Sequence, residues 1–225
     1  MSQKGFLLDL KRCTGCKACQ VACKAENNTR PQRGSTVHGA SVDYRRVVFS
    51  KGTETDPSTL TRRFVSTACY HCTTPACVPV CPVGAISKRS TDGVVLVSYD
   101  LCIGCRRCYF ACPYGAPRYN GAMRKTQKCT FCEHLLEEGR TPACVATCVA
   151  KALLKIDDMP QTDLVTATGN SPEDVPLTGG YNGPNQYSRT AVTYATVLGT
   201  SVSKHAATRP NVAYAATSGG VVEQK

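Results

Sequence analysis

The chain has 225 residues, sixteen cysteines, no tryptophan and a formal net charge of +11. It contains no apolar run near the roughly twenty residues that a membrane-spanning helix needs, so we expect no transmembrane segment. The residues after Met1, SQKGFLLDLKR, lack the long apolar stretch and cleavage site of a secretory signal, so we expect no signal peptide. The positive charge would suit a nucleic-acid partner, but its meaning depends on how the cysteines are used.

Five short segments are expected to be β-strands. They are GFLLDL (residues 5–10), YRRVVF (44–49), RRFVSTAC (62–69), VVLVSY (94–99) and KALLKI (151–156), and residues 24–43 between the first two read as a polar loop. The strand at 94–99 follows an Asp-Gly turn, which is a common way to enter a strand. Nucleophile elbows, phosphate-binding loops and dinucleotide fingerprints are absent from the sequence, so we expect no catalytic apparatus on this chain.

The sixteen cysteines fall into four groups of four. The first group is Cys13, Cys16, Cys19 and Cys23; the second is Cys69, Cys72, Cys77 and Cys81; the third is Cys102, Cys105, Cys108 and Cys112; the fourth is Cys129, Cys132, Cys144 and Cys148. Groups one and three share the spacing C-x2-C-x2-C-x3-C at an offset of 89 residues, and groups two and four share TPAC followed by x3-C. The order A, B, A, B indicates a duplicated unit.

The spacing of groups one and three is typical of bacterial ferredoxins. There, three closely spaced cysteines bind one [4Fe-4S] cluster, and the fourth, one helical turn further on, binds the neighbouring cluster. Gly15 and Gly104 keep the loop free of side-chain bulk, so that backbone amides can approach the cluster sulfurs. Pro82 and Pro113 follow the last cysteines of groups two and three, as in the ferredoxin pattern. We therefore predict four [4Fe-4S] clusters.

Disulfides and zinc are the alternative uses of these cysteines. A disulfide framework suits an even cysteine count, but it normally belongs to a secreted chain and spreads its cysteines more widely. Zinc is held by two C-x2-C pairs per ion, and the third cysteine of groups one and three has no role in such a site. Both alternatives explain the spacing less well than iron-sulfur clusters do.

Groups two and three are close enough in sequence to form one ferredoxin unit, and groups one and four then pair around it. The expected ligand sets are quartet a (Cys13, Cys16, Cys19 and Cys148), quartet b (Cys129, Cys132, Cys144 and Cys23), quartet c (Cys69, Cys72, Cys77 and Cys112) and quartet d (Cys102, Cys105, Cys108 and Cys81). The expected modules are an outer one at 1–60 and 120–159 and an inserted one at 61–119. The outer module has Lys24 and Val149 where proline is common, so the sequence pattern specifies its local geometry less firmly than that of the inserted module.

The clusters would explain the positive charge. A cubane with four thiolates carries about two negative charges when oxidised, so four of them offset about eight positive charges. Basic residues near the cysteine groups are Lys11, Arg12, Lys17, Lys24, Arg106, Arg107, Lys125 and Lys128. We therefore expect no nucleic-acid partner, and we expect His71 to be a neighbour of a cluster rather than a ligand.

Residues 160–225 have no cysteine and are rich in Thr, Ser, Gly, Ala and Pro. They could form a disordered tail or an extended arm that becomes ordered against a partner. The aromatic residues in GGYNGPNQYSRTAVTYATVL favour the extended, partner-binding tail.

The stretches RCTGCKACQVACKAEN, CYHCTTPACVPVCPVGAI, DLCIGCRRCYFACPYGAPRY and KCTFCEHLLEEGRTPAC resemble the four-cluster iron-sulfur subunits of molybdopterin oxidoreductases. The branch most similar includes dimethyl sulfoxide, polysulfide, thiosulfate, tetrathionate and arsenate reductases. The resemblance covers roughly residues 5–157, and the nested pairing of the quartets agrees with it.

The resemblance implies a non-catalytic electron-transfer subunit in a hetero-oligomer. Its partners would be a catalytic subunit holding bis-molybdopterin guanine dinucleotide and a quinone-reactive membrane anchor or a cytochrome, so the chain would be membrane-associated through partners, on a face of the membrane that the sequence does not decide. An iron-sulfur subunit of a hydrogenase or formate dehydrogenase is the alternative within the same class. A zinc-bound interaction or nucleic-acid module is the alternative from another class.

Overall fold

The computed structural model of the chain describes residues 3–9, 12–29, 42–51, 62–157, 164–166, 177–178, 186–188 and 212–215. Its helices are α1 (Ala18–Glu26), α2 (Arg107–Ala111), α3 (Glu133–Glu137) and α4 (Ala143–Ala146). Its strands are β1 (Gly5–Asp9), β2 (Arg45–Lys51), β3 (Arg62–Ala68), β4 (Ile86–Lys88), β5 (Val95–Val97), β6 (Arg118–Asn120), β7 (Lys125–Gln127), β8 (Leu153–Ile156), β9 (Leu164–Thr166), β10 (Leu177–Thr178), β11 (Gln186–Ser188) and β12 (Val212–Ala215). This mixture of short elements fits the predicted α+β class, and the five expected strands are present with shifted ends.

Strands from the two ends of the chain form one mixed sheet. Its order is β10-β8-β1-β12-β11-β9. At its centre β1 is antiparallel to β8, with Leu7 opposite Leu154, and parallel to β12, with Leu7 opposite Ala213. Both β1 and β8 are buried along their whole length, as their apolar sequences predict.

The tail beyond residue 160 contributes four short strands, β9 to β12, to this sheet. Composition alone did not reveal them, because each is only two to four residues long and none shows an alternating pattern. The remaining tail residues lie outside the described residues, as do Leu10, Lys11 and most of the predicted loop at 24–43. Partner binding by the tail stays a prediction.

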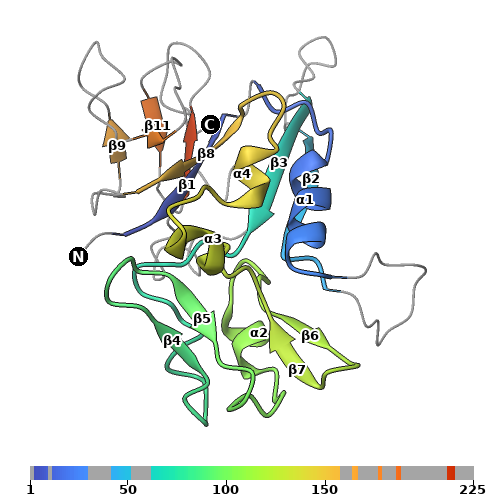
Figure 1. Cartoon of the computed structure of the whole chain (residues 1–225), viewed down its shortest axis with the longest axis vertical. Helices are drawn as coiled ribbons and strands as arrows, with labels where there is room; N and C mark the ends of the chain where they lie inside the picture. Colours follow the sequence, from blue (N-terminus) through green and yellow to red (C-terminus); the bar gives the residue numbers. More distant parts are fainter. Residues whose placement is uncertain are drawn as a thin grey trace.

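The molecule has two halves with different origins in the chain (Figure 1). In the upper half, α1 from the N-terminal part packs against α4, and β1 pairs with β8. In the lower half, the middle of the chain supplies the β4–β5 and β6–β7 hairpins and α2. Segments far apart in sequence thus meet in the upper half, whereas the lower half is built from neighbouring segments.

Two hairpins cross the predicted module boundaries. β2 and β3 are antiparallel, with Arg45 opposite Ala68, so the boundary drawn at residue 60 passes between two paired strands. β6 and β7 likewise pair across residues 119 and 120, with Arg118 opposite Gln127. Each predicted module boundary is therefore crossed by a pair of hydrogen-bonded strands.

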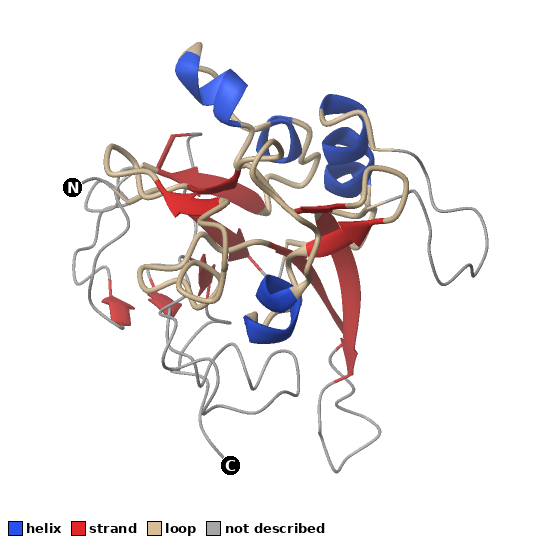
Figure 2. Cartoon of the chain, turned by 90° about the horizontal axis from the view of Figure 1, so that it is seen from below, coloured by secondary structure: helices blue, strands red, loops and turns tan. Residues whose placement is uncertain are grey.

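The apolar core is small and includes cysteines. Phe6 stacks on Phe131 with ring centroids 4.3 Å apart, and Val65 and Tyr70 lie in the same buried cluster, together with Cys19 and Cys144. The strands gather in the middle of the molecule and the short helices lie around them (Figure 2). Within the described residues, none of the helices is long and apolar enough to cross a membrane.

Candidate iron-sulfur sites

The loops that carry groups one and three have the same backbone conformation. Gly15 and Gly104 both have φ of +71°, and Lys17 and Arg106, two residues further on, have φ of +63° and +64°. A Cβ on Gly104 would lie 2.3 Å from the carbonyl oxygen of Arg124, so only glycine fits there. The duplication seen in the sequence is thus repeated in the local geometry.

The two helices that follow these loops end differently. α2 ends at Ala111, and Cys112 is already extended, because Pro113 disfavours a helical conformation in the residue before it. α1 has Lys24 at the corresponding position and continues past Cys23 to Glu26. Without a proline at this position, α1 continues for three residues beyond the last cysteine of its group, whereas α2 stops before its last cysteine.

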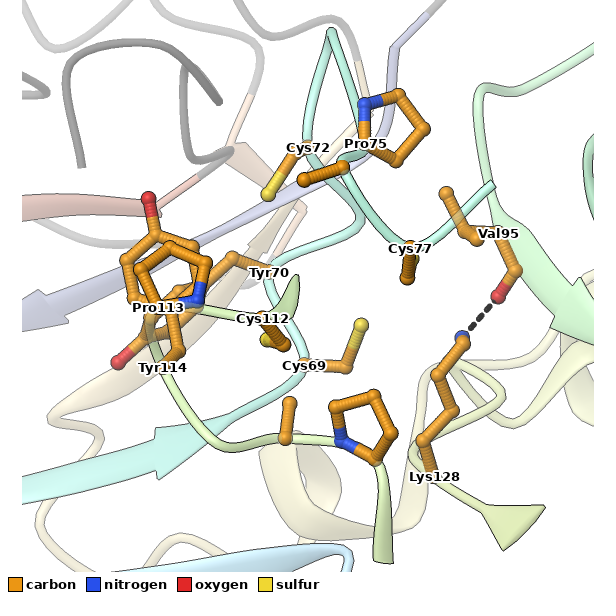
Figure 3. Close-up of a pocket in the computed structure, with 13 residues that line it drawn as sticks. Cys69, Tyr70, Cys72, Pro75, Cys77, Val95, Cys112, Pro113, Tyr114 and Lys128 are labelled. Carbon is orange, nitrogen blue, oxygen red and sulfur yellow. Dashed lines mark hydrogen bonds between the residues drawn. The ribbon is translucent and has the colours of Figure 1, made fainter. Parts of the chain in front are cut away.

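Quartet c lines a single cavity of about 370 Å³, part of it open to solvent. In Figure 3 the side chains of Cys69, Cys72, Cys77 and Cys112 stand around this space. The wall also includes Tyr70, Pro75, Val95, Pro113, Tyr114 and Lys128. The crossing cysteine, Cys112, comes from group three and the other three from group two.

Quartets a and d line two further cavities of similar size. Cys13, Cys16, Cys19 and Cys148 surround about 350 Å³ beside Leu8, Val47 and Leu153. Cys81, Cys102, Cys105 and Cys108 surround about 310 Å³ beside Val83, Ile86 and Ile103. In each cavity, as in that of quartet c, the fourth thiol comes from a different cysteine group.

In quartet b, Cys23 lies on α1, Cys144 lies on α4 and Cys132 directly precedes α3. Cys23 interacts electrostatically with Cys144 and Cys132, and Cys129 interacts with Cys23 and Cys144. All four of its cysteines are buried. The structure thus brings each of the four predicted quartets together.

Burial keeps several of these thiols protonated in the absence of metal. It raises the pKa of Cys77 to about 12 and that of Cys132 to about 11, and thiolates of neighbouring cysteines add to both shifts. Burial likewise raises the pKa of Cys23 to about 12, although Arg45 acts in the opposite direction. Because the thiolate is the metal ligand, binding of iron must release these protons.

Backbone amides point at the cysteine sulfurs. The N–H of Ala85 donates to Cys81 Sγ at 3.2 Å, and that of Ala152 donates to Cys148 Sγ at 3.3 Å. Cys102 Sγ accepts from Thr126 N–H at 3.5 Å, and Cys129 Sγ from Phe131 N–H at 3.4 Å. Quartets a, b and d thus each have an amide donor that would stabilise negative charge on bound sulfur.

The histidines are not arranged as metal ligands in the part of the chain that the structure describes. His71 is fully buried, and its Nδ1 accepts a hydrogen bond from Val95 N–H at 2.9 Å. Burial, Lys128 and Arg45 hold its pKa well below the usual range. His134 lies at the surface, 2.7 Å from Glu26 Oε1, whereas His38 and His205 lie outside the described residues. The position of His71 agrees with a neighbour of quartet c.

Sequence reasoning missed Arg45 and Ser66. Ser66 lines the cavity of quartet a, and its Oγ lies 3.4 Å from Cys19 Sγ. Arg45 is 2% exposed and interacts with four cysteines. Both residues lie on strands more than twenty positions from the cysteines of group one that they approach, so only the pairing of β2 with β3 could have placed them there.

Residues 12–86 and residues 60–157 each match a family described as a 4Fe-4S dicluster domain. The chain is 40% identical over 158 residues to a chain of the anaerobic dimethyl sulfoxide reductase of Escherichia coli (strain K12), covering 68% of this chain and 72% of that protein. It is 41% identical over 170 residues to a subunit of the sulfite dehydrogenase of Allochromatium vinosum, covering 68% of each. It is 44% identical over 149 residues to a subunit of the tetrathionate reductase of Salmonella typhimurium, covering 65% of this chain and 55% of that protein.

The chain belongs to the iron-sulfur subunits of molybdopterin oxidoreductases. As such a subunit, it serves electron transfer in a molybdoenzyme complex. Two dicluster domains imply four [4Fe-4S] clusters, which confirms the cofactor prediction.

The residues of this iron-sulfur subunit fit the cofactor. Three quartets of thiols surround cavities of similar volume, and amide donors face sulfurs of quartets a and d. Among the described residues, no three His, Cys, Asp or Glu side chains converge on a point that could hold one metal ion. In these three quartets the thiols stand around a space, which is the arrangement that a multi-iron cluster requires.

Proposed function

We propose that the four quartets bind the four [4Fe-4S] clusters, and that the chain relays electrons between a bis-molybdopterin guanine dinucleotide catalytic subunit and a quinone-reactive membrane anchor or cytochrome. When bound, the clusters take up and release single electrons. The protein residues space the clusters, exclude water from them and set their potentials. Substrate chemistry would belong to the catalytic partner.

The order of the quartets carries this proposal. Cys19 of quartet a interacts with Cys144 of quartet b, Cys129 of quartet b with Cys69 of quartet c, and Cys77 of quartet c with Cys108 of quartet d. The same pairs share buried clusters, Cys19 with Cys144, Cys129 with Cys69 and Cys77 with Cys108, and this supports a row in the order a, b, c, d. At its ends, Cys16 of quartet a and Cys105 of quartet d are exposed. A row with one exposed thiol at each end suits a relay with one partner at each end.

The nested module arrangement is part of the proposal. Quartets a and b combine group one with group four, and these groups lie on segments that meet through the α1–α4 contact and the β1–β8 pair. Quartets c and d combine groups two and three, which are neighbours in the chain. The crossing ligands are Cys148 and Cys23 in the outer pair and Cys112 and Cys81 in the inserted pair.

We infer that the quartet d end faces the membrane anchor. Leu101, Ile103 and Phe110 are 55%, 62% and 80% exposed around this quartet. Exposed apolar side chains mark protein or membrane contacts, and the exposed Arg106 and Arg107 beside them suit the anionic headgroups near a membrane-embedded partner. The chain would then be membrane-associated through this partner.

Anaerobic copurification tests the function. A tagged copy of the chain should retain a large subunit with molybdenum or tungsten and a smaller membrane subunit, and quinol should reduce its clusters. Dimethyl sulfoxide, sulfite and tetrathionate, the compounds in the relatives' names, are the first substrates to try with the large subunit. Iron without molybdenum or tungsten, together with a hydrogenase subunit, would support the alternative relay.

A further inference from the structure

Arg45 is a buried cation at the start of β2. Its side chain is among the largest that are fully buried, with the residue 2% exposed. Nη1 donates to Ser66 Oγ at 3.0 Å, and the guanidinium lies 4.5 Å from the centroid of the Phe6 ring. Arginine remains charged in proteins, so this position places a permanent positive charge in the interior.

The guanidinium has unused hydrogen-bond capacity. Nε and Nη2 of Arg45 are buried and have no hydrogen-bond partner among the described residues. None of the ion pairs between described residues joins a carboxylate to it. A buried charge with unpaired donors is costly, so its retention indicates an anionic partner at this place.

The groups around Arg45 identify that partner. Burial acts against its charge, but thiolates of Cys144, Cys129, Cys19 and Cys23 act in its favour, in that order of strength. Three of these cysteines belong to quartet b, and Cys19 belongs to quartet a. Ser66 extends the connection, because its Oγ contacts both Arg45 Nη1 and Cys19 Sγ.

The lysines near the quartets, including Lys128 beside Cys129 of quartet b, are used differently. Lys88 Nζ donates to the carbonyl oxygens of Cys72 and Thr73 at 3.2 and 2.9 Å, and Lys125 Nζ donates to the carbonyl oxygen of Cys102 at 2.6 Å. Lys128 Nζ donates to the carbonyl oxygens of Val95 and Cys129. These cations hold backbone near the cysteines, whereas Arg45 keeps two donors available.

We propose that Arg45 is a tuning residue that raises the reduction potential of the cluster at quartet b by placing a fixed positive charge and N–H donors beside its sulfurs. The inference rests on the proposed binding of a cluster at quartet b. A cluster becomes more negative when it is reduced, so a nearby cation and hydrogen bonds to sulfur stabilise the reduced form. Because Arg45 also interacts with Cys19, it should raise the potential of the cluster at quartet a as well, but by less.

The test is a redox titration of the anaerobically purified complex, followed by electron paramagnetic resonance. The cluster at quartet b is recognised as the signal altered by Cys129→Ser. In Arg45→Met the reduced-to-oxidised ratio of this cluster, at a fixed solution potential, should fall at least tenfold, which is about 59 mV for one electron. Arg45→Lys should shift it less and in the same direction. Arg46→Met removes the same charge from the other face of β2 and should leave the potential of this cluster unchanged.

Iron content separates failure of this proposal from failure of the proposed function. Wild-type protein without four clusters would overturn the function itself. Four clusters with unchanged potentials in Arg45→Met, or an equal shift in Arg46→Met, would overturn the role of Arg45 alone. If Arg45→Met loses the cluster at quartet b, the potential of that cluster in Arg45→Lys becomes the test. A potential in Arg45→Lys equal to or above that of the wild type would contradict the proposal.

Discussion

Gly104→Ala should disturb quartet d far more than a glycine substitution at a comparable but open position. Gly104 lies between Cys102 and Cys105 with φ of +71°, and an added Cβ would be 2.3 Å from the carbonyl oxygen of Arg124. Gly84 has a similar φ of +62°, but an added Cβ would meet nothing within 4 Å. Gly84→Ala is therefore the matched control, since it shares the backbone cost and lacks the clash.

The expected loss of stability is the sum of the backbone cost and the cost of the clash. A left-handed conformation costs a residue other than glycine about 1–2 kcal/mol. Overpacking against backbone that cannot easily move adds about 1–3 kcal/mol for Gly104→Ala. Its total is about 2–5 kcal/mol, against about 1–2 kcal/mol for Gly84→Ala. In a protein of this size each kcal/mol lowers Tm by about 2–4 °C.

Thermal unfolding of the anaerobic complex at one scan rate, with iron analysis of each variant, measures the effect. Gly104→Ala should lower Tm by at least roughly twice as many degrees as Gly84→Ala does. In that variant the cluster at quartet d should be the first of the four to lose its signal on heating. Equal Tm values for the two variants, with all four clusters retained in both, would refute the reasoning from the clash.

Three further results are expected. Cys81→Ser should alter the same paramagnetic signal as Cys102→Ser and spare the signal altered by Cys77→Ser, and the opposite grouping would contradict the crossing ligands. A photo-crosslinking amino acid at Phe110 should capture the membrane anchor whereas one at Val149 should not, and the reverse pattern would place the anchor at the other end of the row. Burial alone would raise the pKa of Asp92, but hydrogen bonds from Arg89 and from Val94 N–H lower it overall. Since the folded pKa is the lower one, Asp92 stabilises the fold above about pH 4 and loses this contribution as the pH falls below that value. The difference in Tm between wild type and Asp92→Asn should therefore shrink in acid, and a difference that grows in acid would be inconsistent with this sign.

The cysteine spacing carried much of the site prediction. The third cysteine of groups one and three lies in the first turn of α1 and α2, so the fourth cysteine follows about one turn later and enters another quartet. This local rule was enough to predict that Cys23 and Cys112 each join three cysteines of another sequence group. The five segments were recognisable as strands because each is a short run rich in apolar and β-branched residues.

Arg45 shows what the sequence does not reveal. It stands in a strand rich in apolar residues, and its charge suggests an exposed face, yet the β2–β3 pairing turns it towards Cys144 and Cys129. The strands of the tail were missed for a related reason. β10 and β12 are defined by pairing with β8 and β1, and such long-range pairing leaves little signal in a strand of two to four residues.

Iron, acid-labile sulfide and zinc analysis of the anaerobically purified protein in its complex tests the central claim most directly. Four [4Fe-4S] clusters on sixteen cysteines require about sixteen irons and about sixteen sulfides per chain, with no stoichiometric zinc. About four zinc ions per chain with little iron or sulfide would contradict the electron-relay account.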